Sequence, residues 1–164
     1  MSVLRFVSLV ILAVWIGGLA VLGIVAAPSV FAVLDAHDPV GGRTLAGIVF
    51  GAVFLRFQPV TWILGGLLVA LFGVRAALGP RPGRLAVRIW TVFVMIGISV
   101  GTTFLIIPRL ERIRNSTPGP IASLADTDSR KIEFNRWHGL SNGLMLLTLV
   151  GGLGLIWFET HDTH

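Results

Sequence analysis

The densest group of polar side chains that could do chemistry lies at the start of the last apolar segment. Arg136 and Trp137 come directly before His138, and Ser141 and Asn142 follow three and four residues beyond it, on the same face of a helix. The imidazole could carry a proton or ligate a metal or haem, and the guanidinium could hold an anionic group. Polar groups inside a bilayer are costly, so they prompt a functional hypothesis.

A similar pattern opens an earlier apolar segment, where Arg56 and Phe57 precede Gln58. Placed side by side, the two openings would form a shallow polar pocket at one membrane face. We therefore predict a ligand-binding site formed by Arg56, Gln58, Arg136, Trp137, His138, Ser141 and Asn142. The alternative is structural: arginine and tryptophan anchor helix ends, while His138 and Asn142 hydrogen-bond between helices. We predict no catalytic residue, because no carboxylate lies within the apolar segments to act as acid or base.

The composition places these residues in a membrane protein. Of the 164 residues, 54% are hydrophobic and only 13% are charged, whereas a soluble domain carries about 25% charged residues. The net charge of +5 does not indicate a nucleic-acid partner here, because the arginines bracket apolar segments, where they meet lipid head groups. The absence of cysteine excludes disulfides and thiolate metal sites. We expect no metal and no cofactor, with haem held by His138 as the lesser alternative.

Four apolar segments are long enough to cross a bilayer, which takes about 20 residues as a helix. Helices satisfy their own backbone hydrogen bonds in lipid without closing into a barrel. We predict an all-α membrane protein, a single domain over residues 1–164, whose four transmembrane helices form a bundle at about 6–34, 57–78, 88–108 and 137–158. The first helix is longer than the bilayer requires, and Pro28 is expected to bend it because proline removes an amide donor.

A fifth apolar stretch, at about 43–55, is too short to span the bilayer. Its length suits a short interfacial helix between the first and second transmembrane helices. Extension of the second helix beyond the membrane is an equally supported alternative.

An offset of 80 residues aligns the two halves of the chain. Ile16-Gly17 falls on Ile96-Gly97, and Pro28 falls on Pro108. This pattern predicts a 2+2 internal repeat about an axis along the membrane normal. The alternative is that similar helix boundaries arose independently, because an arginine next to an aromatic residue is a common membrane anchor.

Glycine is abundant and is spaced to allow close contact between helices. The predicted packing glycines are Gly17, Gly18, Gly97, Gly101, Gly139 and Gly143. They favour a non-enzymatic protein, either an accessory or structural subunit of a membrane complex or a self-associating bundle. Its partners would be the lipid bilayer and other membrane subunits or further copies of the chain. The alternatives are a small-ligand binding or transport protein that uses the polar pocket, and a haem- or metal-dependent redox protein.

Several short motifs carry a resemblance to a known family. They are Trp15-Ile-Gly-Gly-Leu-Ala, Ala27-Pro28-Ser-Val-Phe31, Ala46-Gly47-Ile-Val-Phe50 and Trp137-His138-Gly-Leu-Ser141-Asn142. The chain resembles the small integral membrane proteins grouped around transmembrane protein 205, whose bacterial members bear a domain of unknown function. The resemblance implies a four-helix membrane protein and no established reaction; animal members have been linked to drug resistance and secretory traffic.

A fainter likeness is to four-helix membrane proteins of copper resistance and protoporphyrinogen oxidation, which use histidines within helices. This chain has no matching histidine in its first helix, which argues against haem or copper. We expect residence in the bacterial inner (cytoplasmic) membrane. The compact, arginine-rich loop at 75–88 favours cytoplasmic termini under the positive-inside rule.

Overall fold

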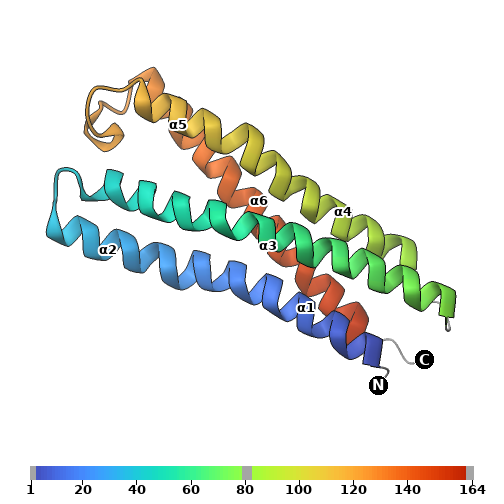
Figure 1. Cartoon of the computed structure of the whole chain (residues 1–164). Coiled ribbons are helices and arrows are strands. Elements are labelled where there is room, and N and C mark those ends of the chain that lie inside the picture. Colours follow the sequence, from blue (N-terminus) through green and yellow to red (C-terminus); the bar gives the residue numbers. More distant parts are fainter. Residues whose placement is uncertain (1–2, 79–82, 162–164) are drawn as a thin grey trace.

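The computed structural model describes residues 3–78 and 83–161 and consists of four long helical rods packed side by side (Figure 1). The first rod runs through α1 (Val3–Ala20), the π-helical turn η1 (Val21–Ala26) and α2 (Ala27–His37). The second is α3 (Gly42–Leu78). The third runs through α4 (Leu85–Gly101), the π-helical turn η2 (Thr102–Ile106) and α5 (Ile107–Asn115). A loop with one 3-10 turn, η3 (Ile121–Ser123), leads to the fourth rod, α6 (Ser129–His161).

All four rods are long and apolar enough to cross a membrane, which confirms the predicted all-α four-helix bundle. They contain 35, 37, 31 and 33 residues, so at about 1.5 Å per residue each exceeds a hydrocarbon core about 30 Å thick. The predicted bounds were shorter because they stopped at charged residues. The helices continue through those residues, since long basic side chains can reach the interface from within a helix.

The segment at 43–55 forms no separate interfacial helix, so that part of the prediction is wrong. It is the first third of α3 and continues without a break into the predicted second span. No residue between 44 and 58 forces a helix to end, and Pro59 stands inside the continuous helix. The segment gains tertiary support from α2, which packs along it after the turn at 38–41.

Prolines in the first and third rods are each preceded by a π-helical turn. Pro28 lies at the start of α2 directly after η1, and Pro108 lies at the start of α5 directly after η2. A proline ring clashes with the carbonyl four residues earlier and donates no hydrogen bond, so a wider turn lets the rod continue through it. The first helix of each predicted repeat unit therefore contains the same feature, a π-helical turn directly before a proline. Each proline would produce this turn locally, so the internal repeat stays a prediction.

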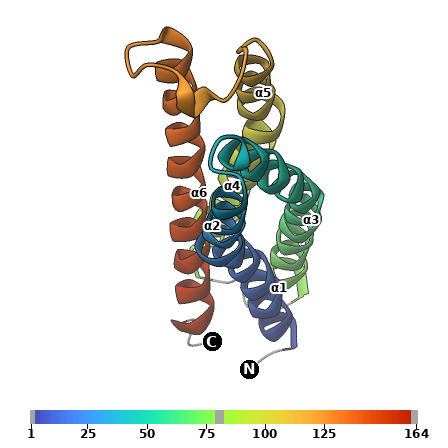
Figure 2. The same ribbon diagram turned by 90° about the vertical axis from the view of Figure 1, so that its left-hand side faces the viewer.

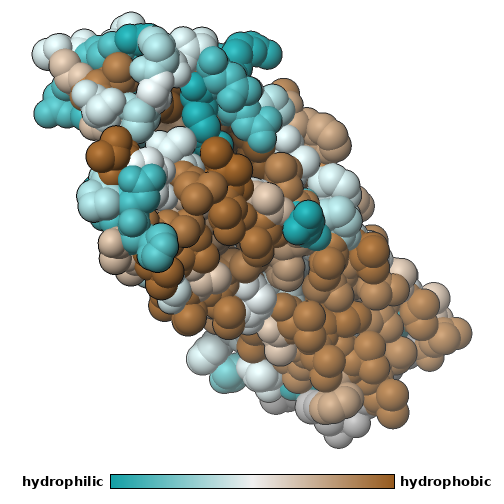
Figure 3. Space-filling view, turned by 60° about the vertical axis from the view of Figure 1, so that its left-hand side comes forward, coloured by the Kyte–Doolittle hydropathy of each residue, from teal (hydrophilic) through white to brown (hydrophobic). Residues whose placement is uncertain are grey.

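The two ends of the bundle differ in packing. The terminal end is the end where Val3 and His161 lie, and the loop end holds the turn at 38–41 and the loop at 116–128 (Figure 1). The buried apolar core lies in the terminal half, where α1, α3, α4 and α6 supply Leu12, Trp15, Leu68, Phe72, Val92 and Leu155. At the loop end, α5 and the start of α6 form two columns linked by the loop at 116–128, and they contact each other (Figure 2). The space-filling surface is apolar along the body and hydrophilic around the loop end (Figure 3).

Candidate functional site

The seven residues predicted to share one polar pocket do not come together. Gln58 is buried in the bundle with 2% of its surface exposed, whereas Arg56 and Arg136 lie on exposed helix faces. His138 and Asn142 are also exposed on α6. The structure distributes the set among a buried polar cluster, an outer helix face and a groove.

The buried polar cluster joins α3 to α4 near the middle of the bundle. Ser99 of α4 donates a hydrogen bond to the side-chain oxygen of Gln58. Its hydroxyl also lies 2.9 Å from the Thr61 hydroxyl and accepts a 2.9 Å hydrogen bond from the Trp62 indole nitrogen. The side-chain oxygen of Gln58 therefore has its hydrogen-bond partner within the bundle.

The exposed group on α6 is held together locally. The His138 ring stacks on Phe134 with 6.1 Å between ring centroids, and its Nε2 lies 3.4 Å from the Asn142 side-chain nitrogen. These contacts are within one helix and involve no other element. In the part of the chain that the structure describes, no three His, Asp or Glu side chains gather into a group that could hold a metal ion.

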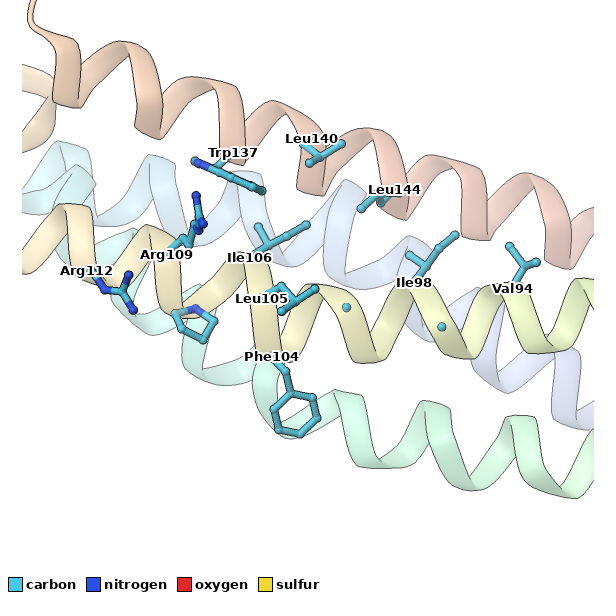
Figure 4. A pocket seen from close by; sticks show the side chains of 13 residues that line it. Val94, Ile98, Phe104, Leu105, Ile106, Arg109, Arg112, Trp137, Leu140 and Leu144 are labelled. Atoms are coloured by element: carbon cyan, nitrogen blue, oxygen red, sulfur yellow. The ribbon is translucent and has the colours of Figure 1, made fainter.

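Trp137 points to the third location, a groove between the third rod and the first half of α6 (Figure 4). The groove has a volume of about 750 Å³, within the usual size range of small-molecule sites. Its lining is Val94, Gly97, Ile98, Gly101, Phe104, Leu105, Ile106, Pro108, Arg109, Arg112, Trp137, Leu140 and Leu144. Two of the predicted packing glycines, Gly97 and Gly101, therefore line this groove.

One end of the groove is cationic. Arg109 reaches from α5 towards Trp137 of α6, and its guanidinium carbon lies 4.9 Å from the centre of the indole ring (Figure 4). Arg112 follows one turn later on α5. Both arginines are exposed, and neither forms an ion pair with a carboxylate of residues 3–78 or 83–161. The groove thus combines a long apolar wall with two positive charges at its loop end.

Two carboxylates in the loop before α6, Asp126 and Asp128, are engaged by cations outside the groove. Lys131 lies 2.8 Å from Asp126, and Arg130 lies 2.7 Å from Asp128. Hydrogen bonds from the Arg130 side chain lower the pKa of Asp128 from 3.8 to about 2. The Lys131 ammonium lowers the pKa of Asp126 in the same way, through a hydrogen bond and its charge. Both acids remain ionised at neutral pH and neutralise cations other than those of the groove.

The predicted packing glycines occupy different environments. A side chain at Gly18 would collide with the Phe57 ring, so α1 and α3 approach closely there. At Gly17, Gly97, Gly101, Gly139 and Gly143 an added Cβ would meet nothing within 4 Å. Within the chain, the tight helix contacts instead use Gly65 against Ile96 and Gly152 against Ile16.

Sequence reasoning missed a buried ionic cluster at the terminal end. Glu159 is fully buried and accepts hydrogen bonds from Arg75, with both oxygens at 2.8 Å, and from Arg88. Arg88 also donates to the Phe158 carbonyl at 3.1 Å, and its guanidinium lies over the Phe158 ring. In the sequence, Arg75, Arg88 and Glu159 stand next to apolar segments and indicate only where a span ends. The number of crossings could have predicted this cluster, because four crossings place the end of α3, the start of α4 and the end of α6 on the same side of the membrane.

The fold and groove define a four-helix integral membrane protein. Residues 10–117 match the family described as a domain of unknown function, DUF4149, and the chain belongs to that family. The match covers α2 to α5 in full and most of α1, and so includes the cationic end of the groove on α5 but not α6. Comparison with curated proteins and with solved structures gave no significant match.

Proposed function

We propose that this protein is a non-enzymatic membrane protein that binds an anionic phospholipid in the groove between the third rod and α6. The observation that carries the proposal is the pairing of an apolar groove of about 750 Å³ with Arg109 and Arg112 at one end of it. The proposal keeps the ligand-binding function predicted from sequence and moves it to a different set of residues.

The apolar wall suits an acyl chain. Val94 and Arg109 are fifteen residues apart along the third rod, or about 22 Å of helix at about 1.5 Å per residue. That span exceeds the half-thickness of a bilayer, about 15 Å. The side chains along it are aliphatic or aromatic, and Gly97 and Gly101 leave room beside the backbone. A chain in this groove would lie parallel to its neighbours in the leaflet at the loop end.

The cationic end suits a phosphate. A guanidinium presents a planar set of donors that matches phosphate oxygens, and Arg109 and Arg112 are both exposed for such contacts. Trp137 beside them is the residue type that lies at head-group level. A head group with net negative charge is favoured over a zwitterionic one, because neither arginine pairs with a carboxylate of the described residues.

The test is lipid retention by the purified protein. Protein in mild detergent would be incubated with phosphatidylglycerol, or with phosphatidylcholine carrying the same acyl chains, and bound lipid counted by native mass spectrometry. We expect one tightly held phosphatidylglycerol and a rise in the melting temperature, because a ligand that binds the folded state stabilises it. Inorganic phosphate alone should give no rise, because it lacks the chain.

Substitutions in the groove test where the phospholipid binds. Replacing both Arg109 and Arg112 with glutamine should weaken phosphatidylglycerol binding about thirtyfold, at about 1 kcal/mol for each arginine near an anionic lipid. Arg56→Gln is the matched control, since Arg56 is an exposed arginine of another helix and belongs to the pocket predicted from sequence. Equal retention of the two lipids, or an equal loss in the Arg56 variant, would contradict the proposal.

An accessory or self-associating role is a second candidate, favoured by the open glycines of α6. Gly139 and Gly143 leave a smooth strip on a helix face that contacts no other part of the described chain at these positions. Small residues allow close helix packing in membranes. Gly139→Leu should then dissociate a partner or oligomer in size-exclusion chromatography with light scattering, while Gly66→Leu, at another open glycine, should not. A lone monomer before substitution would exclude this role.

Haem bound through His138 is tested on the same purified protein. An absorption spectrum without a Soret band would exclude it. The neighbours of His138 are Phe134 and Asn142 of its own helix and the charged Arg114 of α5, and none of these supplies a second axial imidazole.

We further propose that the protein is related to transmembrane protein 205 and lies in the bacterial inner membrane. Its termini are then on the cytoplasmic side. The chain has no cysteine, so a single engineered cysteine reports topology cleanly. Ser123→Cys, in the exposed loop before α6, should react with a membrane-impermeant maleimide added outside spheroplasts. Labelling only after lysis would reverse the orientation and place the groove in the cytoplasmic leaflet.

A further inference from the structure

The side of α6 that points away from the core carries one continuous line of exposed residues. The six residues of this line are Gly139, Gly143, Leu146, Val150, Leu153 and Trp157. They are spaced alternately by four and three positions, which keeps them together along one side of a helix. The buried residues Thr148, Leu155 and Glu159 lie on the opposite side. We call the six exposed residues the outer seam, and it runs for about 27 Å at about 1.5 Å per residue.

Two features distinguish the outer seam from an ordinary lipid-facing surface. Its leucine, valine and tryptophan side chains need no protein partner, because lipid tails are as apolar as leucine. Gly139 and Gly143, in contrast, leave the helix backbone uncovered, since an added Cβ would meet nothing within 4 Å at either position. The second feature is Asn142, an exposed polar side chain directly beside Gly143. The glycines permit another helix to approach closely, and Asn142 requires a neighbour that can form hydrogen bonds.

Asn142 lies at a depth where an amide facing lipid is costly. Trp137 is the residue type found at head-group level, and Asn142 is five residues further along α6, or about 7.5 Å deeper at about 1.5 Å per residue. Among the described residues its side chain has one hydrogen-bond contact, the 3.4 Å approach of Nδ2 to the His138 ring, and its oxygen has none. Hydrocarbon supplies no donor for that oxygen, so polar side chains in this position are rare and favour a protein partner.

We propose that α6 pairs with α6 of a second copy of this chain, about a two-fold axis along the membrane normal, and that Asn142 hydrogen-bonds to the other copy. Copies with the same orientation in one membrane bring identical faces together across such an axis. A carboxamide carries both donors and an acceptor, so the polar edge of this face is complementary to itself. The two glycines bring the backbone carbonyls of the other copy within reach of the amide.

This pairing rests on the self-associating role proposed above and identifies the partner as a second copy. It is independent of phospholipid binding, because the groove residues Trp137, Leu140 and Leu144 lie on another side of α6 from the outer seam. The groove therefore stays open to lipid in the pair. Counting phosphatidylglycerol on the same purified samples reports the groove separately from the pairing.

Single cysteines test the pairing directly in native membranes, because the chain has no cysteine of its own. In a two-fold pair each residue of the outer seam lies near its own counterpart. Leu146→Cys and Val150→Cys should therefore each give a disulfide-linked dimer when the membranes are treated with a thiol oxidant. Ile63→Cys is the matched control, since it is an equally exposed apolar position of α3, at 64% against 59% for Leu146. No dimer at either seam position, or as much dimer at Ile63, would overturn the proposal.

Asn142→Leu tests the hydrogen bond across the pair. Dimerisation measured by energy transfer between labelled copies in phosphatidylcholine vesicles should weaken about tenfold, because two symmetry-related hydrogen bonds are lost. Asn135→Leu makes the same change at an exposed position of α6 before Trp137 and should alter dimerisation less than about twofold. Equal effects of the two variants would remove Asn142 from the interface. A partner that Gly139→Leu releases, without disulfide dimers at the seam, would show that a different protein occupies this face.

Discussion

The arginines at the two ends of the bundle have opposite environments. At the terminal end, Glu159 is fully buried and binds both Arg75 and Arg88. At the loop end, Arg109 and Arg112 are exposed, and no carboxylate of the described residues pairs with them. One end supplies its own anion, whereas the other leaves two guanidiniums exposed, where we propose that an anion from outside binds.

The two ends of the bundle also differ in how their helices pack. The apolar core lies in the terminal half, and the groove opens between the third rod and α6 towards the loop end. A buried carboxylate between two guanidiniums stabilises the structure only when all partners are present, because removing one leaves a buried charge unbalanced. The comparison indicates that arginines at helix ends are structural where the bundle encloses them with an acid; where it does not, we propose that they bind a ligand.

Glu159→Gln should have the largest effect. It removes the only carboxylate among the described residues that balances Arg75 and Arg88, and breaking a buried pair in this way costs about 3–5 kcal/mol. Reversible unfolding in detergent would measure the loss. Glu133→Gln, an exposed acid of the same helix, should change stability little; similar values for the two variants would remove the distinction between the ends.

Trp137→Glu should make the loop end resemble the terminal end. A carboxylate in place of the indole would stand next to Arg109 and compete with an anionic head group. We expect phosphatidylglycerol retention to fall at least tenfold, while stability changes by less than about 1 kcal/mol, because an exposed ion pair contributes little. Trp137→Gln, which brings no charge, should retain more lipid. Equal losses of lipid in both variants would show that retention depends on the Trp137 ring and not on the unpaired charge of Arg109.

Ser99→Ala tests the middle of the bundle, where the two halves meet. The serine hydroxyl bonds Gln58, Thr61 and Trp62, and interhelical hydrogen bonds in membrane proteins contribute about 0.6 kcal/mol on average and up to about 1.7 kcal/mol. We expect a loss in that range in the same unfolding assay. Ser29→Ala, on an exposed face of α2, is the control, and a loss in Ser99→Ala no larger than in Ser29→Ala would contradict the assignment of a stabilising cluster.

The smallest effect concerns Asp128 in the loop. Its folded pKa is about 2 because Arg130 hydrogen-bonds the carboxylate. A lowered folded pKa means that the pair stabilises the loop above about pH 4 and that this contribution is lost as the pH falls towards 2. A ¹³C NMR titration of the carboxyl carbon should show the midpoint, which Arg130→Gln should raise towards the ordinary value of 3.8. An unshifted midpoint in the natural protein would mean that Asp128 is free to pair with the groove arginines.

The number and identity of the helices could be predicted from the sequence, because a bilayer demands about 20 apolar residues for each crossing and the chain shows that pattern four times. The positions of the helix ends could not be predicted from the sequence, because a helix continues through charged residues where tertiary contacts support it. Residues 43–55 are the clearest case: composition allowed two outcomes, and packing against α2 accompanies the continuous helix.

The candidate site could be predicted only in part. Trp137 was identified from its residue type, and it does lie at the groove. Arg56 and His138 were grouped with it because they follow similar helix starts, but helical rotation places them on other faces. Arg109 and Arg112 are not among the predicted site residues, although their spacing of three residues puts them on one face of a helix.

By itself, the sequence determined that this chain forms four membrane-crossing helices with arginines at their ends, because hydropathy and backbone hydrogen bonding in lipid are properties of each segment alone. Only the tertiary structure decided which arginines meet Glu159 and which remain open at the groove. Those outcomes depend on how each rod is rotated about its axis and on which rods lie side by side, and neither is encoded within one segment.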